Sequence, residues 1–229
     1  MIEFAKNLEG WNGALLPGAV TVAGQWVTLE PLSAARHGRD LWQAVEGHDE
    51  VWAYLADGPY ESEAALAGAL AAKETGAAAR FFAILPEAGG VAKGYASLMR
   101  MDPANGVVEV GNILLSPELQ RTRAATEAMY LMARHVFEDL GYRRYEWKCN
   151  ALNLPSRRAA ARLGFAFEGI FRQHMVIKGR NRDTAWFAML DGEWPERKRV
   201  FETWLSRANF DAAGRQIRSF VSIAEDLAR

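Results

Sequence analysis

The chain has 229 residues, of which 50% are hydrophobic and 24% are charged, enough for one well-buried α/β domain of ordinary globular composition. The formal net charge of -1 gives no positive field that would attract nucleic acid or an anionic membrane. The single cysteine, Cys149, excludes an intramolecular disulfide and suits a reducing compartment. The sequence shows neither a signal-peptide pattern nor a run of about 20 apolar residues, so we expect a cytoplasmic protein without a membrane span.

The first half of the chain predicts strands around a helical region. Residues 20–30 predict a first strand or a short hairpin. Residues 34–55 and 61–74 then predict helices, with Ser33 as a helix N-cap and a break at residues 57–59. Short apolar runs separated by turn residues predict the next three strands, at residues 80–85, 91–100 and 107–115.

The second half alternates helices with strands. Helices are predicted from about 122 to 140, where apolar residues recur every three or four positions, and over 154–163. Strands are predicted over 142–149 and in a long hairpin, at residues 165–177 and 183–190. This order predicts an α/β (α+β) fold with a mixed sheet covered by helices on both faces. We expect one domain over 1–194 and a helical extension over 195–229, packed on the domain or at a dimer contact.

The segment from Val107 to Ala128 carries the chemical signal. It predicts a strand, a short loop with few bulky residues, and then a helix. Such a junction leaves backbone N–H groups free at a helix N-terminus, where the helix dipole also favours negative charge. Arg121 and Arg123 add positive charge at the same place, so a diphosphate is a suitable ligand.

Two motifs in this region resemble the coenzyme A-binding core of GNAT N-acetyltransferases, in the RimJ/RimL-like branch. The family's Gln/Arg-x-x-Gly-x-Gly/Ala loop corresponds to Gln120, Arg123 and Ala125. The family's Asn-x-x-Ser…Leu-Gly-Phe element corresponds to Asn153, Ser156 and residues 163–165. Arg123 replaces the central glycine, which normally lets the backbone approach phosphate closely. Either Arg123 tolerates the loop conformation and contacts phosphate through its side chain, or the grip on the pyrophosphate is altered.

The resemblance implies a mostly antiparallel central sheet of about seven strands, with the strands at 107–115 and 142–149 splayed apart. It implies acetyl-CoA as co-substrate, with the pantetheine arm pairing with backbone between those strands. The sequence has no cysteine pair and no His-x-x-x-His motif, so we expect no metal. A backbone N–H in the stretch 112–115 would hold the developing oxyanion. The residues expected to bind the cofactor are Asn112, Ile113, Leu114, Leu115, Gln120, Arg121, Thr122, Arg123, Ala124, Ala125, Thr126, Asn153 and Ser156.

Three residues are candidates for catalysis, each with a structural alternative. Glu109 would act as the base, or be a solvated strand carboxylate in an ion pair. His174 would relay protons, and with Arg172, expected on the same strand face, contact an acidic group of the substrate; its alternative is a structural histidine. Ser156 would lie near the sulfur, or be a helix cap. Ala160 occupies the position of the tyrosine that serves some relatives as acid.

Together these features predict an N-acetyltransferase that moves an acetyl group from acetyl-CoA to a primary amine by direct attack in a ternary complex. The acceptor would be a peptide or protein N-terminus, or a small-molecule amine such as an amino acid. The alternative is a non-catalytic domain that binds coenzyme A as a sensor or scaffold. We expect no nucleic-acid or membrane partner, and a monomer or homodimer. A covalent route through Cys149 is disfavoured, since no base lies beside it in sequence.

Overall fold

The computed structural model describes residues 8–86 and 90–227. The extreme N-terminus, on which the expected absence of a signal peptide partly rests, lies outside these residues, as do residues 87–89 between the apolar runs predicted at 80–85 and 91–100. Within the described ranges, no helix is long and apolar enough to cross a membrane.

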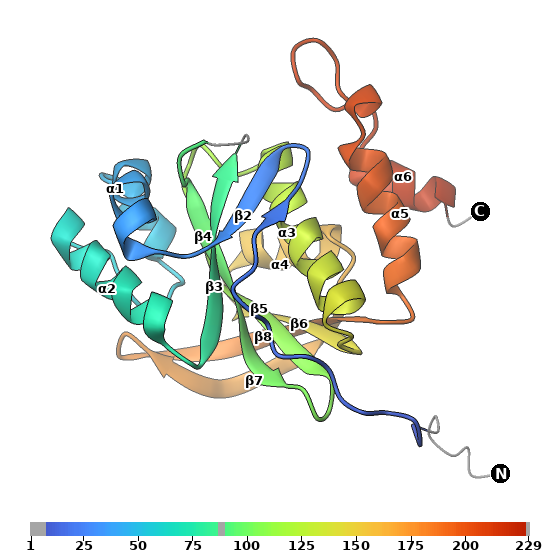
Figure 1. Ribbon diagram of the computed structural model, residues 1–229, viewed down its shortest axis with the longest axis horizontal. Coiled ribbons are helices and arrows are strands. Elements are labelled where there is room, and N and C mark those ends of the chain that lie inside the picture. The colour runs from blue at the N-terminus through green and yellow to red at the C-terminus, as the bar shows by residue number, and fades with distance from the viewer. Residues whose placement is uncertain (1–7, 87–89, 228–229) are drawn as a thin grey trace.

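An eight-stranded sheet forms the centre of the molecule (Figure 1). Its strands in chain order are β1 (Val22–Ala23), β2 (Val27–Pro31), β3 (Ala79–Pro86), β4 (Gly94–Asp102), β5 (Val107–Leu115), β6 (Arg144–Asn150), β7 (Ala166–Ile177) and β8 (Arg180–Leu190). Their spatial order is β1-β2-β3-β4-β5-β6-β8-β7, and every neighbouring pair is antiparallel except β5 and β6. The predicted mixed, mostly antiparallel sheet is therefore confirmed. The additional strand is the two-residue β1, which forms a small hairpin with β2.

In the part of the chain that the structure describes, six α-helices accompany the sheet: α1 (Ala34–Val45), α2 (Glu63–Thr75), α3 (Arg123–Arg134), α4 (Leu154–Arg162), α5 (Trp194–Leu205) and α6 (Phe220–Leu227). The helix predicted over 34–55 is too long. It ends at Val45, because Gly47 adopts a left-handed conformation with φ of 75°, and a short 3-10 turn over Asp49–Trp52 follows. The helix predicted to reach residue 140 changes at His135 into a π turn that ends at Asp139.

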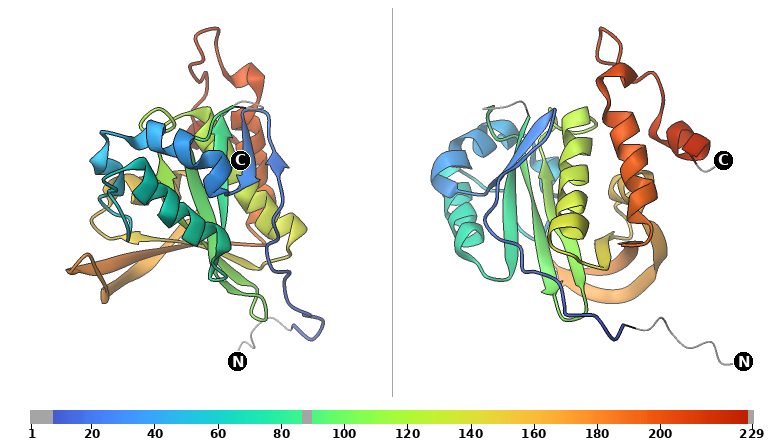
Figure 2. Two further views of the ribbon diagram at one scale, coloured as in Figure 1. Left: turned by 60° about the vertical axis from the view of Figure 1, so that its left-hand side comes forward. Right: turned by 45° about the vertical axis from the view of Figure 1, so that its right-hand side comes forward.

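The helices lie in layers on the two faces of the sheet. The right-hand view of Figure 2 places α1 and α2 on one face, α3 on the other, and α5 outside α3. On the first face, Leu41 and Leu70 pack with Tyr95 and Leu114 of the sheet. On the second face, the C-terminal helices join the main core, where the ring of Phe201 lies 5.5 Å from that of Tyr130 in α3.

The parallel seam between β5 and β6 is short. It pairs four residues of each strand, from Val107 opposite Arg144 to Val110 opposite Trp147. Beyond this point β5 continues to Leu115 and β6 to Asn150 without pairing to one another. The predicted splay between these strands is therefore present. A bulge in β5 accompanies it, where Asn112 adopts a positive φ of 49°.

Candidate active site

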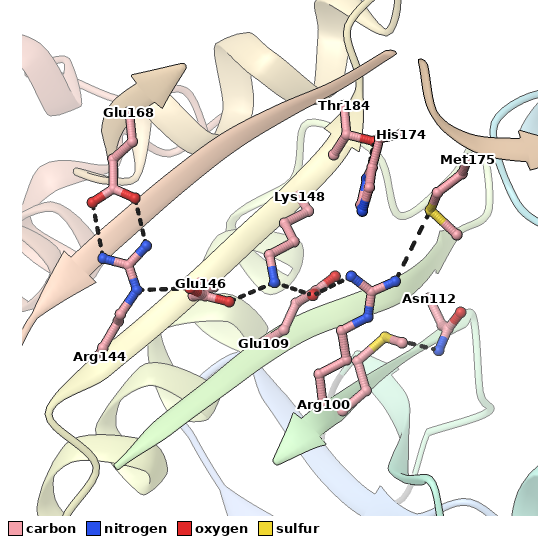
Figure 3. A network of polar contacts seen from close by, with 11 residues as sticks. Arg100, Glu109, Asn112, Arg144, Glu146, Lys148, Glu168, His174, Met175 and Thr184 are labelled. Carbon is pink, nitrogen blue, oxygen red and sulfur yellow. Dashed lines mark hydrogen bonds and ion pairs between the residues drawn. The ribbon is translucent and has the colours of Figure 1, made fainter. Parts of the chain in front are cut away.

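Glu109 lies at the end of the paired part of the seam, facing away from α3. Its neighbours Val108 and Val110 point into the core shared with α3, so strand alternation directs Glu109 to the opposite face. Its carboxylate Oε2 lies 3.0 Å from Nζ of Lys148 and 3.4 Å from a guanidinium nitrogen of Arg100 (Figure 3). The side chain is buried, so the solvated carboxylate of the structural alternative is not what forms here. Burial raises the pKa of Glu109, although Lys148 and Arg100 act in the opposite direction.

A row of alternating charges continues from Glu109 across the sheet. Lys148 Nζ also lies 2.5 Å from Oε2 of Glu146, and Arg144 donates from Nε to the other oxygen of Glu146 at 2.7 Å. Arg144 then forms a bidentate pair with Glu168 of β7 (Figure 3). The sequence analysis did not identify Lys148 or Glu146. The sequence shows that Glu146 and Lys148 are two residues apart in one strand. It does not show the register between β5 and β6 that places them beside Glu109.

His174 lies on the same side of the sheet, in a wide bulge of β7. The register shifts there by two residues, and Gln173 adopts a positive φ of 51°. The expectation that Arg172 and His174 lie on the same face assumed that side chains alternate strictly along the strand. The bulge interrupts this alternation, so the expectation no longer follows. His174 instead lies beside Phe171, with ring centroids 5.7 Å apart, and its Nδ1 lies 2.9 Å from the hydroxyl of Thr184.

The charge around His174 is positive. Partial burial lowers the pKa of His174, and nearby Arg100, Arg182 and Lys148 lower it further, so the ring is neutral at neutral pH. Arg182, which the sequence analysis did not identify, is half-buried, and its Nε has no hydrogen-bond partner among the described residues. Arg172 is exposed. Asp183 caps the bulge, since its carboxylate accepts the backbone N–H of Gln173 at 2.7 Å.

Ser156 and Asn153 lie at the start of α4, near the end of β6. Asn153 is the N-cap of this helix, and its side-chain oxygen accepts the backbone N–H of Ser156 at 3.1 Å. The Ser156 hydroxyl oxygen accepts the indole N–H of Trp147 at 3.0 Å. Burial raises the pKa of the Cys149 thiol, and a hydrogen bond between that thiol and the Ser156 hydroxyl acts in the opposite direction. Trp147 belongs to the core shared with α3, so Ser156 and Glu109 approach the splay from opposite faces of the sheet.

The N-terminus of α3 provides the predicted donors. Thr122 is the N-cap, and its hydroxyl oxygen accepts the backbone N–H of Ala125 at 3.1 Å. The first-turn N–H groups of Arg123 and Ala124 have no acceptor within the helix and remain available to an anion. Arg121 precedes them in a left-handed conformation, with φ of 62° and an exposed side chain. Arg123, at the position of the family's glycine, is the first residue of the helix, and the left-handed residue of the loop is Arg121.

The Arg123 side chain lies against two aromatic rings. Its guanidinium carbon lies 3.9 Å from the ring centroid of Trp26 and 5.5 Å from that of Phe210. A cavity of about 680 Å³ opens beside the same helix end, within the size range of ligand sites. Arg123, Thr122 and Ala124 contribute to its lining, together with Lys93.

The other residues predicted to bind the cofactor lie on β5, on the loop after it and on α3. Leu114 points into the core, and the amide nitrogen of Asn112 donates to the hydroxyl of Ser97 at 3.0 Å, so these residues can offer a ligand mainly their backbone. Gln120 is exposed and donates to the backbone oxygen of Leu115 at 3.1 Å. Three further residues predicted to bind the cofactor belong to the same elements: Ile113 lies in β5, and Ala125 and Thr126 lie in the first turn of α3.

Comparison with known proteins identifies the family. The family model described as "Acetyltransferase (GNAT) domain" matches residues 27–166. The crystal structure of a GCN5-related N-acetyltransferase from Brucella melitensis is 46% identical, with a TM-score of 0.93, and the match covers 95% of this chain and 100% of that one. A structure of a "probable acetyltransferases (GNAT family)" from Chromobacterium violaceum ATCC 12472 is 40% identical, with a TM-score of 0.80, over 85% of this chain and 98% of that one.

One curated relative adds a name from a narrower group. The Bacillus subtilis (strain 168) protein named "Putative ribosomal N-acetyltransferase YdaF" is 28% identical over 105 residues, which are 46% of this chain. The match spans 57% of that relative's length. Because the family model covers more than half of the chain and agrees with the splayed sheet, the chain belongs to the GNAT acetyltransferase family of acyltransferases.

Proposed function

We propose that the protein transfers an acetyl group from acetyl-CoA to a primary amine by direct attack in a ternary complex. The observation that carries this proposal is the position of Glu109, a buried carboxylate at the point where β5 and β6 stop pairing. A base at this point can reach an amine that approaches the gap between the strands from the Glu109 face.

The residues around the gap suit acetyl-CoA as the co-substrate. The unpaired edges of β5 after Val110 and of β6 after Trp147 offer backbone groups to the extended pantetheine arm. The free N–H groups of Arg123 and Ala124 and the charge of Arg121 suit the diphosphate. When bound, acetyl-CoA supplies the acetyl thioester that the amine attacks.

Each protein group then has a defined task. Glu109 would accept the proton of the incoming ammonium, and its raised pKa brings it closer to the working pH of a general base. A backbone N–H in the stretch 112–115 would stabilise the developing oxyanion. Ser156, which lies at the start of α4 near the end of β6, is the group that we assign to protonation of the leaving sulfur.

We propose a peptide or protein N-terminus as the preferred acceptor, on the strength of the name of the Bacillus subtilis relative. A carboxylate-bearing small molecule, such as an amino acid, is a second candidate. The positive groups near His174, namely Arg100, Arg182 and Lys148, favour it. In either case we propose action in the cytoplasm as a monomer or homodimer, without a metal, a membrane or nucleic acid.

The test supplies acetyl-CoA with a panel of N-terminal peptides and free amino acids, and follows coenzyme A release and the product mass. We expect acetylated product with the wild-type protein and its loss with Glu109→Gln. The matched control is Glu196→Gln, a partly exposed glutamate paired with Arg197, which should retain activity. A protein that binds coenzyme A but acetylates no member of the panel would support the sensor or scaffold alternative instead.

A further inference from the structure

Lys148 connects two buried carboxylates at the seam. Its Nζ lies 3.0 Å from Oε2 of Glu109 and 2.5 Å from Oε2 of Glu146. The side chains of all three residues are between 5% and 7% exposed, so solvent screens these contacts little. This differs from the exposed ion pairs elsewhere on the molecule, whose strength water reduces.

The position of the ammonium group is fixed from a third direction. Lys148 pairs in register with Trp186 of β8, and Nζ lies 3.9 Å from the centroid of that indole ring. The aromatic face attracts the ammonium but accepts no strong hydrogen bond, so the strongest partners of the ammonium are the two carboxylates with which it forms ion pairs. The indole thereby limits where Lys148 can move.

The two carboxylates compete for this single ammonium. Glu109 and Glu146 are directly opposite in the parallel register, on the same face of the sheet. Two buried negative charges so close raise each other's cost of ionisation, and a shared cation offsets that cost. Each carboxylate has one further cation, since Arg100 faces Glu109 at 3.4 Å and Arg144 binds Glu146.

We propose that Lys148 is a positioning residue that keeps Glu109 ionised and oriented as the base, and that Glu146 tunes Glu109 by competing for the same ammonium. This inference rests on the proposed function, in which Glu109 takes the proton of the acceptor. The proton passes from the acceptor ammonium to the Glu109 carboxylate and then to solvent. Lys148 takes no part in that path; it acts only through its charge and its hold on Oε2.

Other charged groups face Glu109 and are common to all variants of the test. Arg100 from β4 and Arg182 from β8 act on Glu109 directly. Arg144 from β6 pairs with Glu146, and His174 from β7 lies among Arg100, Arg182 and Lys148. A change at Lys148 or Glu146 leaves these groups in place. Lys148→Met removes the shared cation, whereas Glu146→Gln removes both the competition for that cation and the direct repulsion between the two carboxylates.

The experiment compares Lys148→Met with Glu146→Gln, which should shift the acid limb of the pH profile of kcat/KM in opposite directions. Lys148→Met removes the nearest cation and should move the acid limb of the kcat/KM profile to higher pH, by about one unit or more. Glu146→Gln removes the competing carboxylate and should move the same limb to lower pH. Lys148→Arg keeps a cation and should restore much of the wild-type position. Lys198→Met, which removes the partly exposed pair with Glu138, is the matched control and should not move the limb.

A second measurement separates this inference from the proposed function. Carbon-13 NMR titration of the glutamate carboxyl groups, with Glu109 assigned from Glu109→Gln, follows its ionisation without requiring turnover. If the wild type acetylates nothing, the proposed function fails, whereas the titration still decides whether Lys148 and Glu146 act on Glu109 in opposite directions. A purely structural role for Lys148 would lower activity in both variants without opposite shifts, and that result would overturn the inference. If Lys148→Met does not fold, Lys148→Gln takes its place with the same upward shift expected, and an unshifted limb in the folded variant would overturn the inference.

Discussion

The guanidinium of Arg123 stacks on the indole of Trp26, with 3.9 Å between the guanidinium carbon and the ring centroid. Trp26 belongs to the loop before β2, and Arg207 approaches the same ring at 5.3 Å from the C-terminal segment. We predict that Arg123→Ala lowers the free energy of unfolding by about 1–2 kcal/mol, because a partly buried cation–π contact is lost. Urea denaturation measures this change.

The companion variant is Arg121→Ala, which removes an exposed arginine at the same helix end. We expect it to weaken coenzyme A binding, measured by calorimetry, with little change in stability. We assign Arg123 to stabilising the fold and Arg121 to binding coenzyme A. This division is wrong if Arg123→Ala leaves the stability unchanged and weakens coenzyme A binding as much as Arg121→Ala does.

The cap of α3 can be tested at Thr122. Its hydroxyl accepts the backbone N–H of Ala125 and donates to the backbone oxygen of Leu119 at 2.7 Å. Thr122→Ala should reduce stability by about 1 kcal/mol, as is typical for loss of an N-cap, whereas Thr122→Ser should retain most of it. Equal stability of the two variants in urea denaturation would show that the hydroxyl does not stabilise this helix.

His37 should make the stability depend on pH. It is buried in α1, and its Nδ1 accepts the backbone N–H of Ser33 at 3.1 Å. Burial, and then the charge of Arg36, lower the pKa of His37 below 6.5. As the pH falls below 6.5, the unfolded chain therefore binds the proton first, and the folded state loses stability until its own lower pKa is passed.

We therefore expect the free energy of unfolding of wild type to fall more steeply than that of His37→Gln between about pH 7 and pH 5. Denaturation curves at several pH values measure the difference between the two proteins. The control is His48→Gln at an exposed histidine, which should follow the wild-type curve. Parallel curves for wild type and His37→Gln would contradict the prediction.

Cys149 should not be a nucleophile. Its thiol is buried, and burial raises its pKa, so little thiolate forms at neutral pH. We predict that Cys149→Ala acetylates its acceptor at a rate close to that of wild type, and that a thiol reagent labels Cys149 much faster in urea than in the folded protein. Loss of turnover in a folded Cys149→Ala protein would instead support the covalent route.

The sequence predicted the fold well where the local signals were strong. The strand over Val107–Leu115 has the bounds that its apolar run and flanking turns indicate. The end of α1 was missed because a single glycine, Gly47, ends the helix while apolar residues continue beyond it. Periodicity alone does not detect such an interruption.

The candidate site was predicted less completely, because its decisive contacts join different strands. Glu109 was predicted as the base from the resemblance to the family, but its contact with Lys148 depends on a register that only the folded sheet determines. Arg172 and His174 were assigned to one face by alternation, and the bulge at Gln173 interrupts it. No glycine marks that bulge, so the local sequence carried little warning.

The short seam between β5 and β6 also bears on solubility. Strand edges with unpaired backbone groups are ordinarily places where proteins stick to one another and aggregate. Here the unpaired edges of β5 beyond Val110 and of β6 beyond Trp147 face each other in the middle of the sheet. The opposite edge of β5 pairs with β4, and the opposite edge of β6 pairs with β8. A second folded molecule cannot align its own sheet against them. A narrow, extended molecule can enter the gap. The shape of the gap alone therefore restricts which molecules can form hydrogen bonds with the unpaired backbone groups of β5 and β6.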